Sequence, residues 1–219
     1  MGCEVLSGAE ATERLAGLGL TVEMVERVVR RADADASMCT AFDPPIMEGL
    51  MRWGRTNRYL REELAEAGWR FDNPRNLPRT IPPGGEFAIV ATTGDDLTGL
   101  AEDFLPATKY AKGLATADAV IRNGQLTLDF GDFDFSSGEE RAAGGTVPQT
   151  WFMLFYVNDD AFRVEVSLPD GITDGRITSW AERIILPPFP REDGGLTGVA
   201  PPAGDQPAAD DVVVAVSRR

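Results

Sequence analysis

The sequence contains no histidine among its 219 residues. Histidine is the side chain that titrates nearest to neutral pH, and it supplies the general base of Ser-His-Asp and Cys-His catalysis and many of the ligands in zinc sites. These catalytic and metal-binding classes are therefore excluded. The two cysteines, Cys3 and Cys39, do not have the spacing of a metal or redox site. They are expected to be free thiols in a reducing compartment.

Positive charge and long apolar runs are also scarce. The chain has 21 Lys and Arg against 35 Asp and Glu, so its surface as a whole repels nucleic acid and anionic membranes. Residues 1–90 carry 11 basic and 14 acidic groups, so any anion-binding face is expected there. No apolar stretch approaches the ~18 residues of a membrane span, and the first residues lack a signal-peptide pattern. A cytoplasmic protein without a membrane partner is expected.

The strongest fold signal is the segment 151–169, which reads as two strands joined by a turn at residues 158–160. The first run is apolar at nearly every position, which is typical of a strand buried on both faces. The second run alternates, with Arg163, Glu165 and Ser167 predicted to face water. A hairpin alone is marginal in water, so other elements must cover this one. Further strands are predicted over residues 86–91, 125–130 and 176–186.

Helical spacing of apolar residues predicts three N-terminal helices, over residues 8–18, 22–38 and 44–68. Thr21 and Asp43 are the predicted N-caps of the second and third. The third helix has an apolar stripe formed by Ile46, Leu50, Trp53, Leu60 and Leu64. Asn57 is the polar member of this stripe, so its amide is expected to be hydrogen-bonded or to lie at a partner interface.

Together these elements predict an α+β protein, in which an N-terminal helical region packs on a mostly antiparallel sheet and a disordered acidic C-terminal tail follows. The predicted regions are 1–80, helical with an arginine-containing loop; 84–189, mostly β and able to form one domain with the helices; and 190–219, the flexible tail. The tail ends in a β-prone run, residues 211–219 (DVVVAVSRR), that could add a strand to the edge of its own sheet or of a partner's.

Arginines recur at every third position of the third predicted helix, at Arg52, Arg55, Arg58 and Arg61. At 100° per residue the row winds around the helix by about 60° per step, so neighbouring pairs rather than the whole row could clamp a phosphate or carboxylate. Arg75 and Arg79, in the Pro-rich segment 69–85, complete the candidate binding residues. Nucleic acid could bind at these N-terminal arginines. The alternative is a solvated face of ion pairs.

A catalytic site without histidine would depend on carboxylates and amines. The predicted strand over 86–91 runs into a Thr/Gly/Asp turn, where carboxylates could hold Mg²⁺. The candidate metal ligands are Asp95, Asp96, Asp132 and Asp134. Glu165 and Lys112 are, with Asp95 and Asp96, the candidate catalytic residues. Magnesium is a cofactor only under this alternative, and the cluster around Asp132 lacks the glycine and final glutamate of a calcium loop.

No motif fixes an activity. The favoured function is a non-catalytic binding or adaptor subunit of a bacterial cytoplasmic protein complex, with a protein partner. The first alternative is a histidine-free, metal-dependent enzyme that processes nucleotides or phosphates with Asp/Glu and Lys/Arg side chains. A minority alternative is an acidic protein that occupies the DNA-binding site of a partner, although its acidic residues are scattered rather than set at phosphate spacing.

Overall fold

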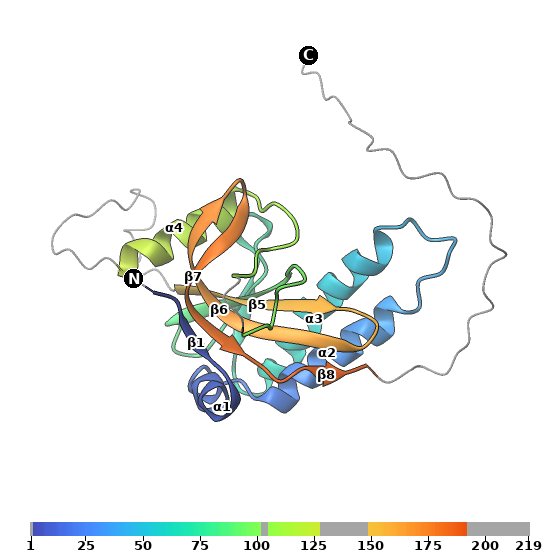
Figure 1. Ribbon diagram of the computed structural model, residues 1–219, viewed down its shortest axis with the longest axis horizontal. Helices are drawn as coiled ribbons and strands as arrows, with labels where there is room; N and C mark the ends of the chain where they lie inside the picture. Colours follow the sequence, from blue (N-terminus) through green and yellow to red (C-terminus); the bar gives the residue numbers. More distant parts are fainter. Residues whose placement is uncertain (1, 102–104, 128–148, 192–219) are drawn as a thin grey trace, which may run out of the picture.

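The computed structural model describes residues 2–101, 105–127 and 149–191 (Figure 1). The chain begins with β1 (Glu4–Leu6), α1 (Gly8–Gly17), α2 (Val22–Ala36) and α3 (Met47–Ala65). It continues with β2 (Arg70–Asp72), the 3₁₀ turn η1 (Pro74–Asn76), β3 (Arg79–Ile81), β4 (Phe87–Thr93) and α4 (Leu114–Thr127). The last described elements are β5 (Gln149–Val157), β6 (Ala161–Thr173), β7 (Arg176–Ile185) and β8 (Phe189–Pro190).

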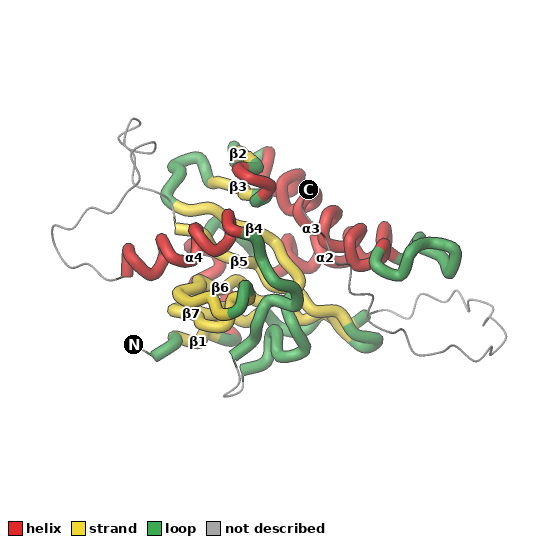
Figure 2. Tube along the Cα trace, turned by 90° about the horizontal axis from the view of Figure 1, so that it is seen from above, coloured by secondary structure: helices red, strands yellow, loops and turns green. Residues whose placement is uncertain are grey.

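The described strands form one sheet in the order β1-β7-β6-β5-β4-β3-β2, with β8 paired to β6 (Figure 2). Two pairs are parallel, β1 with β7 and β4 with β5, and the others are antiparallel. The β5–β6 hairpin is at the centre, with Leu154 opposite Glu165. The predicted α+β class, with N-terminal helices on a mostly antiparallel sheet, is confirmed.

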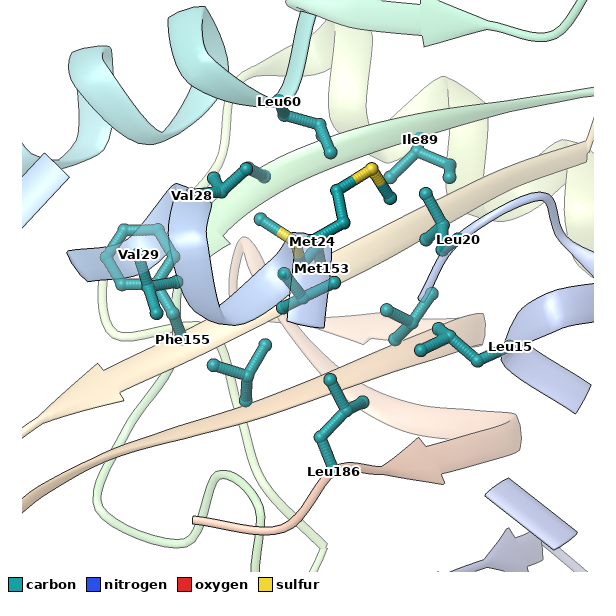
Figure 3. Close-up of a cluster of buried hydrophobic side chains, with 14 of the residues drawn as sticks. Leu15, Leu20, Met24, Val28, Val29, Leu60, Ile89, Met153, Phe155 and Leu186 are labelled. Carbon is teal, nitrogen blue, oxygen red and sulfur yellow. The ribbon is translucent and has the colours of Figure 1, made fainter. Parts of the chain in front are cut away.

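The first face of the sheet packs on α1, α2 and α3. Its strand residues include Ile89, Ala91, Trp151, Met153, Phe155, Val164, Val166 and Ile184. Leu15 of α1, Met24 and Val28 of α2, and Leu60 of α3 meet this face in one cluster (Figure 3). The helical region and the sheet therefore share a core.

The second face packs on α4 and on the chain that follows β4. Its apolar cluster consists of Leu77, Val90, Ala119, Val120, Phe152, Leu154, Ile177 and Trp180. The indole of Trp180 donates to the Pro106 carbonyl at 2.8 Å, and the Thr108 N–H donates to the Ile177 carbonyl at 3.2 Å. These bonds hold the segment after β4 over β7. The central strands are thus covered on both sides, as a buried sheet requires.

Two local predictions on the helices are confirmed. The Thr21 hydroxyl accepts from the Met24 N–H at 3.2 Å and so caps α2. The buried Asn57 amide donates to the Ala91 carbonyl of β4 at 3.1 Å and to the Trp53 carbonyl at 3.0 Å. The amide on the apolar stripe therefore links α3 to the sheet.

Other local predictions are wrong. Asp43 does not cap α3, because the helix begins four residues later with Ile46 at its N-cap. Residues 69–85 are not a plain loop, since they contain the antiparallel pair β2–β3. Residues 125–127 belong to α4 rather than to a strand. The alternation in β6 predicts that Glu165 and Ser167 face water, but both are fully buried on the second face.

Some predicted features lie outside the described residues. Residues 192–219, which include the β-prone run, are most of the predicted tail, and Asp132 and Asp134 fall within 128–148. None of the helices in the described part of the chain is both long and apolar enough to cross a bilayer.

Candidate functional site

The connection between α2 and α3 exposes large apolar side chains. Phe42 is completely exposed, and Met38 and Ile46 keep 79% and 74% of their surface in water. Leu50, in the first turn of α3, is 51% exposed. We call residues 37–50 the α2–α3 tip; in Figure 1 it extends on the right beyond the strands. Exposed apolar patches on proteins often mark interaction sites.

The exposure follows from the length of the α3 stripe relative to the sheet. The stripe buries Leu60 and Leu64 against the core and half-buries Trp53. It then continues one and two turns further to Leu50 and Ile46, because residues three and four apart share a face of a helix. These last members lie past the sheet, so they have no core to pack against.

Hydrogen bonds fix the backbone of the α2–α3 tip. The Asp43 carboxylate accepts from the Thr40 N–H at 2.8 Å and from its hydroxyl at 3.2 Å. The Asp43 N–H donates to the Thr40 carbonyl at 3.0 Å, and the Met47 N–H donates to the Pro44 carbonyl at 2.8 Å. The connection is therefore partly ordered before anything binds, which lowers the entropic cost of association.

Ion pairs tie the base of the tip together. Asp33 of α2 accepts from Arg52 of α3 at 2.8 Å and pairs with Arg191 at 3.0 Å. The Tyr59 hydroxyl donates to Asp35 at 2.6 Å, and this bond raises the pKa of Tyr59. Arg191 is the last described residue, so the chain leaves the described structure beside Asp33.

The tip is acidic as well as apolar. Residues 37–50 contain no Lys or Arg, and their acidic residues are Asp43 and Glu48. Burial, together with the nearby carboxylates, raises the pKa of the Cys39 thiol. A complementary surface would therefore combine apolar contacts with basic groups at its rim.

The arginines of the α3 row all have acceptors within the chain. The acceptors are Asp33 and Glu48 for Arg52, Asp35 for Arg55, Glu62 for Arg58, and Asn73 with the Asp72 carbonyl for Arg61. The hydrogen bond from Arg58 holds the pKa of Glu62 below its ordinary value. An external anion would have to compete with these oxygens. The anion-binding role of the row stays a prediction.

Arg75 and Arg79 are also engaged. Arg79 donates to both carboxylate oxygens of Asp72, at 2.8 and 2.6 Å, and these bonds hold the pKa of Asp72 below its ordinary value. Arg75 pairs with Asp118 of α4 at 2.8 Å. Residues 75–77 and 113–116 line a pocket of about 440 Å³ at the N-terminal end of α4. Arg79 therefore shares Asp72 with Arg61 of the α3 row, whereas Arg75 lies against α4.

Asp95 orders the turn that follows β4. One carboxylate oxygen accepts from the Leu97 N–H at 3.2 Å, and the other accepts from the Ala107 N–H at 2.9 Å. Asp96 is exposed, and its carbonyl accepts from Arg163 at 2.6 Å. The two adjacent carboxylates therefore have different environments, and Asp95 has both oxygens engaged by the backbone.

Glu165 lies at the centre of a buried polar network. It forms a two-point ion pair with Arg183 of β7, at 3.1 and 2.6 Å, and both side chains are completely buried. It also accepts from the Ser167 hydroxyl at 2.8 Å and from the Gly99 N–H at 2.9 Å. A Cβ on Gly99 would lie 2.9 Å from the Cβ of Arg163, so this close approach requires glycine. The network ties the segment after β4 to the sheet.

Lys112 approaches the second face from the segment before α4. Its ammonium donates to the Thr92 hydroxyl of β4 at 2.7 Å. Burial lowers its pKa to about 8. Lys112, Asp95 and Glu165 thus lie on the same side of the sheet, but each has its own set of contacts. No cluster of three acidic or cysteine side chains suited to a metal occurs among the described residues.

The comparisons with known proteins do not identify this arrangement. The chain matches no family model, no curated protein and no solved structure. The site must therefore be argued from its own chemistry.

The sequence analysis did not predict the exposure of the apolar residues at the tip. Ile46 and Leu50 belong to the predicted apolar stripe, and Met38 ends the second predicted helix. A signal was present, since the stripe of α3 starts before the first turn of the helix and Phe42 sits between Thr40 and Asp43 in a turn-forming sequence. The sequence does not show where the sheet ends beneath the helices.

Proposed function

We propose that this chain is a non-catalytic binding subunit that engages a partner protein through the α2–α3 tip. The observation that carries the proposal is the complete exposure of Phe42, with Met38 and Ile46 close to it in the sequence and mostly in water. Aromatic residues and methionine are enriched at the centres of protein interfaces. This exposure supports the adaptor role expected from the sequence and directs the proposal to one surface.

The free energy available from this surface supports the proposal. Burying one large apolar side chain contributes about 1.5–3 kcal/mol. Phe42, Met38 and Ile46 would therefore contribute several kcal/mol together, which is enough for a small group of dominant contacts. The backbone bonds from Asp43 to Thr40 mean that less ordering accompanies their burial.

The charge of the tip specifies the kind of partner. Asp43 and Glu48 are the charged residues of the tip. We expect a partner with an apolar groove that receives Phe42 and with Arg or Lys side chains around its rim. Such rim charges act mainly on the association rate and make that rate depend on salt.

Site-specific photo-crosslinking tests the surface in the intact protein. A photoreactive phenylalanine analogue is placed at Phe42 in one variant and at Leu114 of α4 in a control, because Leu114 is 79% exposed on a different part of the molecule. Irradiation in the native cells should join a protein to position 42 and not to position 114. Equal products at the two positions, or none at position 42, would contradict the proposal.

The captured protein then allows a quantitative test. With that protein purified, Phe42→Ser combined with Ile46→Ser should weaken binding by about 100-fold or more, as expected for the loss of central contacts. The matched control, Leu114→Ser, should leave the affinity unchanged. The double variant should keep the melting temperature of the parent, since exposed side chains contribute little to the core.

A further inference from the structure

We infer that the apolar run at residues 212–216 of this same chain occupies the α2–α3 tip when no partner is bound. Residues 192–219 lie outside the described structure, but their sequence, their length and the place where they begin are known. The inference concerns the free protein. Its regulatory consequence rests on the proposed function.

The tail begins at the base of the tip. Arg191 pairs with Asp33, and its N–H donates to the Asp160 carbonyl at 2.8 Å. Asp33 lies on α2, six residues before Cys39 of the tip. At a rise of 1.5 Å per helical residue, this separation is on the order of 10 Å. The described chain therefore ends near the exposed apolar side chains of the tip.

The length of the tail allows the run to return to the tip. About twenty residues separate Arg191 from Val212, and a flexible chain of that length has an r.m.s. end-to-end distance of about 25 Å. The span to the tip is shorter than this distance. A tether of this kind holds the run at an effective concentration on the order of 1 mM, so that even a weak contact is populated.

The composition of the tail suits this role. Residues 192–211 are rich in Gly, Pro, Ala and Asp, with Leu196 and Val199 as their large apolar residues. Residues 212–216 read Val-Val-Val-Ala-Val, and they are followed by Ser217, Arg218 and Arg219. The run itself is apolar, with Asp210 and Asp211 directly before it and the basic residues of the tail after it. The tip combines apolar side chains with Asp43 and Glu48, so the run matches the tip in apolar character and the two arginines that follow the run match these carboxylates.

The tip suits the run better than the edges of the described sheet do. The outer strands β1 and β2 are three residues long, so each offers few free backbone groups to an added strand. The tip offers Phe42, which has no contact that removes it from water. We therefore assign the run to the tip rather than to strand addition.

As a consequence, the tail competes with a partner protein for the tip. A partner that binds the tip must displace the tail, and its apparent affinity falls by the fraction of molecules in which the tip is free. Removing residues 211–219 should then raise the affinity of a partner for the tip by about two- to tenfold.

Disulfide trapping in the full-length chain tests the contact without any partner. Cys39 provides a native thiol in the tip, and Cys3→Ser removes the other cysteine. In this background Ser217→Cys places a thiol directly after the run, and the control Ala203→Cys places one nearer to the start of the tail. The rate of the intramolecular disulfide with Cys39 is measured in dilute protein by non-reducing electrophoresis and mass spectrometry.

Which of the two introduced cysteines forms the disulfide with Cys39 faster depends on whether the run is docked or the tail is a free tether. For a free tether, loop closure favours the nearer cysteine, and Ala203→Cys should react about threefold faster than Ser217→Cys. For a docked run, Ser217→Cys should react faster than Ala203→Cys. Adding Phe42→Ser and Ile46→Ser should restore the free-tether order. The inference would be overturned if Ala203→Cys reacts faster than Ser217→Cys in the chain with an intact tip. It would also be overturned if Ser217→Cys reacts equally fast with and without the tip substitutions.

The outcomes separate this inference from the proposed function. A free-tether order together with crosslinking of a partner at position 42 would remove the tail contact and leave the binding surface in place. A docked run with no partner crosslinked at position 42 would establish the tail contact and contradict the partner proposal. If both hold, deletion of residues 211–219 must also increase the partner affinity.

Discussion

Replacing Lys112 with methionine should make the protein more stable near neutral pH. The ammonium is mostly buried, its hydrogen bond among the described residues is to Thr92, and burial lowers its pKa to about 8. The ordinary lysine pKa is 10.5, so the folded state disfavours the charged form that the unfolded chain adopts. Methionine has a similar length and removes the charge. The penalty for burying an ammonium then disappears.

The magnitude follows from the difference between the two pKa values. Below about pH 8 both states are protonated, and the penalty is at its full value of about 3 kcal/mol, since one pKa unit corresponds to about 1.4 kcal/mol. As the pH rises from 8 toward 10.5, the unfolded chain retains the proton that the folded chain loses, so the parent becomes more stable. Losing the bond to Thr92 costs about 1 kcal/mol. Lys112→Met should thus stabilise by about 2 kcal/mol near pH 7 and destabilise slightly above pH 10.5.

Urea unfolding of the parent and of Lys112→Met, at several values between pH 7 and pH 10.5, measures this difference. Comparing the two proteins at each pH cancels the titration of the remaining groups, provided that their m-values agree. The advantage of the variant should shrink steadily as the pH rises. A constant difference across the range would refute the reasoning, because it would mean that the amine titrates alike in the folded and unfolded chains.

The buried polar network and the turn after β4 give two more predictions. Arg183→Met should cost about 3–5 kcal/mol in urea unfolding because it leaves Glu165 buried and unpaired, whereas Glu165→Leu combined with Arg183→Met should cost much less; equal losses would contradict the ion-pair account. Asp95→Ala should cost about 1–3 kcal/mol because two backbone N–H groups lose their acceptor, and exposed Asp96→Ala should change stability by less than about 0.5 kcal/mol. Stabilisation of the parent by Mg²⁺ that Asp95→Ala abolishes would instead favour a metal role for this turn.

The central hairpin and the helices could be predicted because their signals are local. The unbroken apolar run at 151–157 indicates a strand buried on both faces, and β5 has that environment. Thr21 caps α2 through its own side chain. Helix spacing, caps and turns depend on residues a few positions apart, so one sequence is sufficient to reveal them.

Two of the predictions that failed depend on the tertiary fold. Polar residues alternating in β6 indicate a water-facing strand, but Glu165 pairs with Arg183, 18 residues away, and accepts from Gly99, 66 residues away. No local pattern reveals such partners. Residues 69–85 indicate a loop because proline is frequent there, yet proline is tolerated beside edge strands such as β2.

In the candidate site, too, some features could be predicted from local sequence and others depend on the assembled fold. The carboxylates and the amine, Asp95, Glu165 and Lys112, could be identified from the sequence by residue type, but their availability could not. In the fold, Asp95 and Glu165 accept hydrogen bonds at both oxygens, so they maintain the structure of the second face. The exposure of Phe42 depends on where the sheet ends beneath α3, which is a property of the assembled fold.

Apolar surface that no described residue covers is therefore located at the tip, whereas the carboxylate oxygens of the polar network have partners. The oxygens of Asp95 and Glu165 accept hydrogen bonds from the described chain. Phe42 is in the opposite state, because none of its surface is buried in the described structure and the ~2 kcal/mol that its burial would contribute is not realised there. Ile46 and Met38 are also mostly exposed, and each leaves a similar free energy of burial unrealised. Selection for stability of the isolated fold would favour polar residues at these positions, so the apolar side chains are best explained by an occupant that buries them.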